Sequence, residues 1–161
     1  NPPEKFERVF AKAETEGFRK VAHAGEEGPA DYIWGALDVL GVERIDHGVQ
    51  CVQDPELVQL LAAKQIPLTV CPLSNTKLCV FPRMEDHNLQ QLLDASLRVM
   101  LNSDDPAYFG GYINENFAAV QRAFDLDQAA LVQYAIRSVD ASFAPDTRKS
   151  ALRDEIIQAT S

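Results

Sequence analysis

Residues 41–72 have the sequence GVERIDHGVQCVQDPELVQLLAAKQIPLTVCP, and this stretch decides the fold class. Strands are predicted over residues 43–47 and 67–71, which end at a glycine and a proline. A helix is predicted over residues 54–64, because aspartate caps a helix and proline suits its first position. A strand, a helix and a second strand in this order predict a βα unit of a parallel sheet.

The same alternation continues on both sides of this stretch. Helices are predicted over residues 5–16, 31–40 and 88–95, strands over residues 18–23 and 98–102, and a long loop over residues 73–87. The strand ends fall near residues 23, 47, 71 and 102, so they are 24 to 31 residues apart. A (β/α)8 barrel averages about 31 residues per unit, and four units make half a barrel, although a small open α/β sandwich has similar spacing.

The C-terminal third has no predicted strand. Three helices are predicted there, over residues 113–124, 127–139 and 145–159. We therefore expect residues 1–161 to form a single partial α/β domain, with barrel units over about residues 1–111 and further C-terminal helices over about residues 112–161.

The amino-acid composition limits the kinds of ligand and partner that we expect for this chain. The net charge is −9 and the isoelectric point is near 4.7, which argues against a nucleic-acid polymer and favours a small neutral ligand. No apolar run reaches the roughly 20 residues of a membrane helix. The three cysteines, Cys51, Cys71 and Cys79, have no paired spacing. They predict a reducing, cytoplasmic location and three small buried hydrophobic side chains.

Side chains with catalytic chemistry gather at the predicted strand ends. His23 ends the first strand and Glu26 follows three residues later, His47 ends the second strand, and Asp104 and Asp105 follow the fourth. The carboxyl ends of parallel strands meet at the edge where ligands bind. Imidazole and carboxylate bind zinc, zinc lowers the pKa of its water to about 7, and a second histidine or a glutamate can move protons.

Each of these residues also has an ordinary structural explanation. A strand-end histidine can be a hydrogen-bonded loop residue, Glu26 can be a solvated charge, and the two aspartates before Pro106 can begin a helix. Ser74 and Asn75 are common turn residues, and His87 lies away from the strand ends. The joint placement of the strand-end residues is what favours a site.

Four motifs resemble those of the adenosine deaminase family of purine aminohydrolases. They are HAGE at residues 23–26, RIDHG at 44–48, CPLSN at 71–75 and SDDP at 103–106. The resemblance covers about residues 18–106, with the motifs in the order that the family has.

The resemblance implies a (β/α)8 barrel with one zinc ion and hydrolysis of an amino group at C6 of a purine. By similarity, His23 and Asp104 are zinc ligands, and Glu26 protonates the ring nitrogen beside C6. His47 orients and deprotonates the zinc-bound water, and Asp105 binds the five-membered ring of the purine.

The stretch TVCPLSNTKLCV at residues 69–80 is more similar to the adenine deaminases of the family. Our hypothesis for this preference is that the bulky residues Leu78, Cys79 and Val80 fill the space that a ribose would need. We therefore expect deamination of adenine to hypoxanthine in purine salvage, with adenosine or an N6-substituted adenine as the alternative substrate.

One departure concerns the metal. The family takes two more zinc ligands from a His-x-His motif, which is absent from these 161 residues. We expect the chain to be the C-terminal half of the barrel, to bind zinc weakly and to be inactive alone. Exposed strand edges would favour self-association.

Two other functions are possible. The chain could belong to a phosphoester or amide hydrolase of another metal-dependent barrel class, or it could be a non-enzymatic binding module. The Pro-Cys-x-x-Cys motif of the cytidine-type zinc deaminases is absent.

Overall fold

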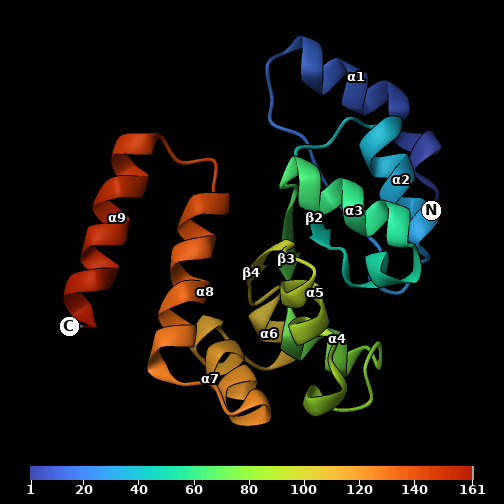
Figure 1. Ribbon diagram of the computed structural model, residues 1–161. Helices are drawn as coiled ribbons and strands as arrows, with labels where there is room; N and C mark the ends of the chain where they lie inside the picture. Colours follow the sequence, from blue (N-terminus) through green and yellow to red (C-terminus); the bar gives the residue numbers. More distant parts are fainter. Residues whose placement is uncertain (161) are drawn as a thin grey trace. The chain divides into compact units, whose positions relative to one another are not determined.

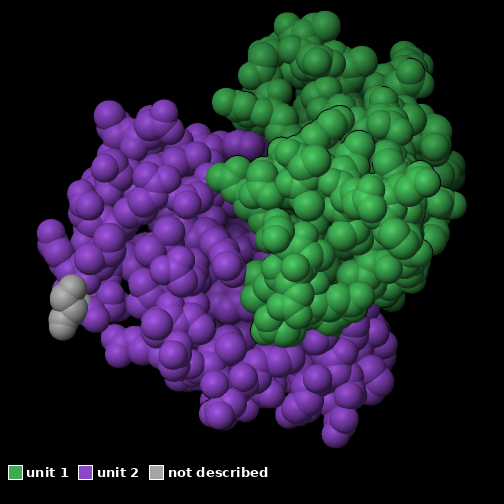
Figure 2. Space-filling view, in the orientation of Figure 1, with its two compact units in different colours: residues 1–70, 88–98 green, residues 71–87, 99–161 purple. Residues whose placement is uncertain are grey.

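The computed structural model describes residues 1–160, and the chain divides into two compact units. Unit 1 contains Asn1–Val70 and Asn88–Arg98, and unit 2 contains Cys71–His87 and Val99–Ser161 (Figure 2). The strands follow one another in chain order in a four-stranded sheet, β1-β2-β3-β4. No helix within the described part of the chain is both long and apolar enough to cross a membrane.

Unit 1 carries three strands and the helices between them. Its elements are η1 (Pro3–Phe6), α1 (Glu7–Thr15), β1 (Val21–Ala24), α2 (Ala30–Asp38), β2 (Arg44–His47), η2 (Val49–Gln53), α3 (Pro55–Lys64), β3 (Pro67–Val70) and α5 (Leu89–Asp94). Both strand pairs are parallel, with His23 opposite Asp46 and Asp46 opposite Thr69. This register aligns the carboxyl ends of the three strands.

The apolar core of unit 1 fixes that register. Ile45 of β2 and Leu68 of β3 are completely buried, as are Ile33 of α2 and Leu57 and Leu61 of α3. A slip of one residue in a strand would turn its apolar side chains to the opposite face of the sheet, so burial on both strands selects a single pairing.

Unit 2 contains the shorter connections and the C-terminal helices. Its elements are α4 (Pro72–Lys77), η3 (Met84–Asp86), most of β4 (Arg98–Leu101), α6 (Pro106–Phe109), α7 (Ile113–Phe124), α8 (Gln128–Ala141) and α9 (Asp146–Ala159). Helices α8 and α9 lie side by side (Figure 1). The three predicted C-terminal helices are confirmed.

The main difference from the sequence prediction is the segment 73–87. We predict a loop there, but the chain forms α4 and η3. Pro72, which the prediction treats as the stop of a strand, also occupies the first position of α4, where a missing N–H costs nothing. The first strand begins at Val21 rather than at residue 18, and residues 106–109 form the unpredicted helix α6.

The cysteines agree with the prediction at two of three positions. Cys51 and Cys71 are buried, and burial raises the pKa of the Cys51 thiol to about 12. A thiol with so high a pKa is unreactive at neutral pH. Cys79 is exposed, so the prediction of a buried side chain is wrong there.

Candidate active site

Strand β1 and the loop after it carry two of the predicted site residues, His23 in the strand and Glu26 in the loop. The side chain of His23 is exposed, whereas that of Glu26 is only 17 % exposed. Between them Gly25 has a φ of +66°, and a Cβ at this position would lie 2.4 Å from Cδ1 of Ile33. A glycine is therefore required for the turn that brings Glu26 back over the strand end.

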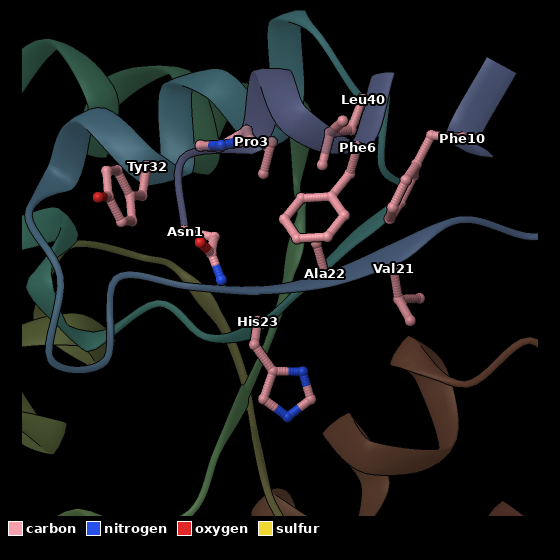
Figure 3. Close-up of a pocket in the computed structure, with 10 residues that line it drawn as sticks. Asn1, Pro3, Phe6, Phe10, Val21, Ala22, His23, Tyr32 and Leu40 are labelled. Atoms are coloured by element: carbon pink, nitrogen blue, oxygen red, sulfur yellow. The ribbon is translucent and has the colours of Figure 1, made fainter. Parts of the chain in front are cut away.

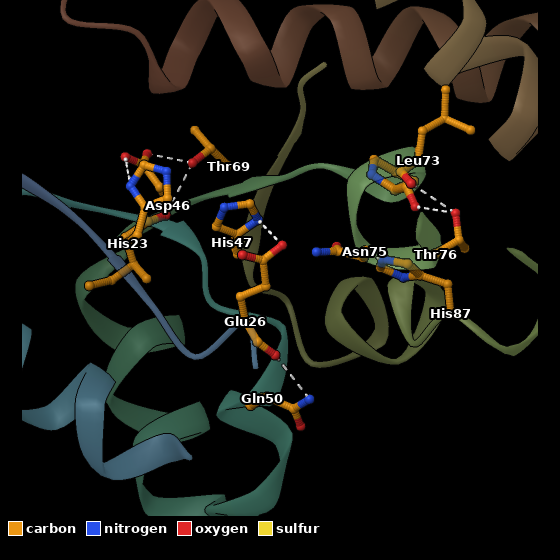
Figure 4. A network of polar contacts seen from close by, with 12 residues as sticks. His23, Glu26, Asp46, His47, Gln50, Thr69, Leu73, Asn75, Thr76 and His87 are labelled. Atoms are coloured by element: carbon orange, nitrogen blue, oxygen red, sulfur yellow. Dashed lines mark hydrogen bonds and ion pairs between the residues drawn. The ribbon is translucent and has the colours of Figure 1, made fainter. Parts of the chain in front are cut away.

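His47, at the end of β2, is the buried member of the site. Its side chain is almost completely inaccessible and its φ is +67°, a conformation that residues other than glycine seldom adopt. Its Nδ1 lies 3.2 Å from Oε1 of Glu26, and its ring centroid lies 5.1 Å from that of His23 (Figure 4). The two imidazoles and one carboxylate therefore gather where β1 and β2 end.

Gln50 holds the loop that carries Glu26. The backbone N–H of Gln50 donates to the carbonyl oxygen of Gly25 at 2.9 Å, and its side-chain Nε2 donates to that of Glu26 at 3.2 Å. The loops after β1 and β2 are thus joined by two hydrogen bonds from one residue. This arrangement fixes the backbone beneath the Glu26 carboxylate.

Asp46 holds the ring of His23. One carboxylate oxygen, Oδ2, lies 3.5 Å from Nδ1 of His23. The other, Oδ1, accepts from Oγ1 of Thr69 at 2.5 Å and from Nε of Arg44 at 3.2 Å. A carboxylate behind one ring nitrogen orients the other nitrogen toward a metal in many zinc sites.

Sequence reasoning does not identify Asp46 and Gln50 as contributors. The parallel register offers a signal for Asp46, because it places this residue directly opposite His23. Gln50 lies two residues beyond Gly48 in η2, and no pattern in the sequence indicates that its side chain reaches back to Glu26.

The predicted residues Asp104 and Asp105 lie in unit 2, directly after β4, and both are exposed. Asp104 has a φ of +57°, so it shares the left-handed backbone of His47. Oδ1 of Asp105 accepts from the backbone N–H of Tyr108 at 3.1 Å and thereby caps α6. The helix-initiating explanation for this aspartate is therefore correct.

Unit 2 also buries polar side chains that we describe as common turn residues. Ser74 and Asn75 of α4 are fully buried, and His87 is almost fully buried. Nε2 of His87 lies 3.2 Å from Oδ1 of Asn75, and the ring centroid of His87 lies 4.3 Å from that of Phe81. His87 and Asn75 therefore contact each other within unit 2.

A cavity of about 270 Å³ lies in unit 1 beside β1, and His23 is among the residues that line it. Phe6, Phe10, Tyr32 and Leu40 form much of its apolar wall (Figure 3). The imidazole of His23 points away from Phe6 and Leu40 in this view.

The donor atoms of the site suit a zinc ion. The Asp46 carboxylate leaves Nε2 of His23 as the nitrogen for a metal, and an imidazole nitrogen is a donor of the kind that zinc accepts. His47 and Glu26, which contact each other, form a pair that can pass a proton. Such a set serves hydrolysis by an activated water.

The adenosine deaminase family model matches residues 1–159, so the chain belongs to this family. Among curated relatives it is 57 % identical over 152 residues to an adenine deaminase of Hahella chejuensis, covering 94 % of this chain and 46 % of that protein. An adenine deaminase of Crocosphaera subtropica is 59 % identical over 152 residues, covering 94 % and 47 %. The chain spans about half the length of the curated relatives it matches.

Solved structures agree with these relatives. The crystal structure of an adenine deaminase from Arthrobacter aurescens matches with a TM-score of 0.96 and 50 % identity, covering 99 % of this chain and 49 % of that one. A zinc-bound amidohydrolase from Burkholderia ambifaria matches with a TM-score of 0.87 and 30 % identity, covering 99 % and 45 %. These matches confirm the predicted α/β fold and its assignment as a partial barrel.

Proposed function

We propose that this chain is the C-terminal half of an enzyme that hydrolyses adenine to hypoxanthine and ammonia. The observation that carries the proposal is the contact of His47 with Glu26 beside His23, at the carboxyl ends of β1 and β2. The identity to two adenine deaminases supports adenine as the substrate. We call the chain joined to its N-terminal half, with that half's His-x-His motif, the complete enzyme.

In the complete enzyme, His23 and Asp104 would hold zinc together with the two histidines of the N-terminal half. Zinc, when bound, lowers the pKa of a water molecule to about 7, so that hydroxide is available at neutral pH. The topology supports this ligand set, because His23 and Asp104 end or follow strands of one sheet.

Two residues of this chain move protons in the proposed reaction. His47 takes the proton from the attacking water, and its burial holds the ring in one orientation. Glu26 gives a proton to the ring nitrogen beside C6, which makes that carbon more electrophilic. Asp105 binds the five-membered ring through the oxygen that does not cap α6. The proton on His47 then passes to the amino group, which leaves as ammonia. The water oxygen remains on C6, and its second proton returns to Glu26.

The 161 residues alone should bind zinc weakly and release no ammonia from adenine. They supply two of the ligands, whereas a catalytic zinc usually has three from the protein. We further propose a cytoplasmic enzyme with a small purine as its ligand and with neither a nucleic-acid polymer nor a membrane as partner, in line with the net charge of −9. Without the N-terminal half, exposed strand edges favour self-association.

The test is an ammonia-release assay of the complete enzyme with adenine and adenosine side by side, in wild type and in Glu26→Gln. We expect adenine to be the better substrate, and we expect kcat in Glu26→Gln to fall by about 10²- to 10⁴-fold, the usual contribution of a general acid. Glu27→Gln is the matched control, because Glu27 is the exposed neighbour.

Faster turnover of adenosine would overturn the choice of substrate, and a wild-type rate in Glu26→Gln would overturn the role of that residue. Ammonia release by residues 1–161 alone would contradict the need for the N-terminal half.

A further inference from the structure

A buried amide in α7, Asn116, joins two segments of unit 2 that are distant in sequence. Its side chain is completely inaccessible to solvent. Oδ1 accepts from the backbone N–H of Leu73 at 3.1 Å, and Nδ2 donates to the carbonyl oxygens of Tyr112 at 2.9 Å and Gly111 at 3.5 Å. Both donor hydrogens and the acceptor of this amide are therefore used.

The contact with Leu73 supplies what α4 lacks at its own start. The first N–H groups of a helix have no partner within the helix, and a side chain at the N-cap usually accepts from one of them. In α4 the N-cap residue Cys71 makes no such hydrogen bond, and Pro72 has no N–H. The N–H of Leu73 is instead satisfied by Asn116, which is 43 residues away in sequence.

The packing beside this amide is equally close. A Cβ at Gly111 would lie 2.4 Å from Cδ1 of Leu73 and 3.0 Å from Cβ of Glu115. A side chain at residue 111 would therefore require Leu73 and Glu115 to shift, and glycine allows the close approach. Leu73, Gly111 and Asn116 together form one contact, which we call the α4–α7 joint.

We propose that Asn116 is a positioning residue for the reaction, an inference that rests on the proposed function. The α4–α7 joint fixes the first turn of α4, which carries Ser74 and Asn75, against the segment that follows Asp104 and Asp105. These segments follow β3 and β4, where a parallel barrel binds its substrate. Asn116 acts on the substrate through them.

Two variants of the complete enzyme separate the halves of the joint. Asn116→Ala removes all three hydrogen bonds. Asn116→Asp keeps an acceptor for the N–H of Leu73 but places a second oxygen against the carbonyls of Gly111 and Tyr112. Asn114→Ala is the matched control, because Asn114 is an exposed residue of the same helix.

Steady-state kinetics with adenine test the proposal. The rates are expressed per bound zinc and are measured well below the melting temperature. We expect kcat/KM to fall by about 10- to 100-fold in Asn116→Ala, chiefly through a higher KM, because a displacement of about 1 Å can cost this much. We expect a smaller fall in Asn116→Asp and a change below about two-fold in Asn114→Ala.

A merely structural amide would give a different result. Both Asn116 variants would then have a lower melting temperature but wild-type kcat and KM per zinc, and the proposal would be overturned. If Asn116→Ala does not fold, Asn116→Asp and Gly111→Ala decide the question by the same measurement.

Amide hydrogen exchange tests the α4–α7 joint without a substrate. We expect faster exchange over residues 73–78 and 111–113 in Asn116→Asp than in Asn114→Ala, and equal exchange would overturn the joint. If the wild-type enzyme does not deaminate adenine, the proposed function fails, and the exchange result still shows whether Asn116 holds the two segments together.

Discussion

Among single residues, His87 is notable because its imidazole ring, a base, is buried. Burial lowers its pKa from the ordinary 6.5 to about 4. Because the folded pKa lies below the unfolded one, the unfolded chain binds more protons between pH 4 and 6.5. The contribution of this residue to stability is therefore complete above pH 6.5 and is lost as the pH falls toward 4.

This pKa predicts a difference between wild type and His87→Gln. Between pH 7 and pH 5 the free energy of unfolding of the wild type should fall by about 2 kcal/mol more than that of the variant. Urea unfolding of both proteins at the two pH values measures this. Equal pH dependence in the two proteins would show that His87 is not a buried neutral base.

Sequence reasoning identifies some residues of the candidate site and overlooks others for a physical reason. His23, Glu26 and His47 have donor chemistry and a place at a strand end, and both are visible in the sequence. Asn116 and His87 depend on partners from other elements. Their neighbours in the sequence do not indicate the contacts that they make, from Asn116 Oδ1 to the N–H of Leu73 at 3.1 Å and from His87 Nε2 to Oδ1 of Asn75 at 3.2 Å.

Among the helices and strands, α2 and α3 are joined by a single side chain, that of Asp54. Its Oδ1 accepts from the backbone N–H of Glu56 at 2.9 Å and of Leu57 at 3.3 Å, so it caps α3. Its Oδ2 accepts from Nε1 of Trp34 in α2 at 2.7 Å, and this bond is the chief reason that the pKa of Asp54 is lowered. One side chain therefore begins one helix and holds another.

We expect Asp54→Ala to lower the melting temperature by about 2–8 °C, because it removes both the cap and the bond to Trp34. Asp54→Asn should lower it by less, since the amide oxygen keeps the cap but the amide NH2 group cannot accept from Trp34. Thermal unfolding followed by circular dichroism measures both variants. If Asp54→Ala has the same melting temperature as the wild type, the role of this cap is refuted.

Local signals explain why some elements are predictable and others are not. Helix α3 begins at Pro55 after its Asp54 cap, as the sequence predicts, and α7 has the predicted bounds, Ile113–Phe124. Helix α4 escapes prediction because its first N–H is satisfied by Asn116 rather than by a residue of its own N-cap. A short segment with a distant cap looks like a loop in the sequence.

At the scale of the whole molecule, the proposed metal site requires more than this chain provides. His23 ends β1 and Asp104 follows β4, so the proposed zinc depends on residues 81 positions apart (104 − 23) and on the histidines of the N-terminal half. The predicted alternation of strands and helices is confirmed, and it is the reason for expecting these ends at one edge. The motifs, rather than this alternation, distinguish a deaminase barrel from an open α/β sandwich.

The metal content of the complete enzyme tests the central claim most directly. We expect about one zinc per chain in the wild type. We expect a large loss of zinc in both His23→Ala and Asp104→Ala and an unchanged content in Asp94→Ala, a control in α5. Full zinc content in both ligand variants, measured on folded protein by elemental analysis, would contradict the account.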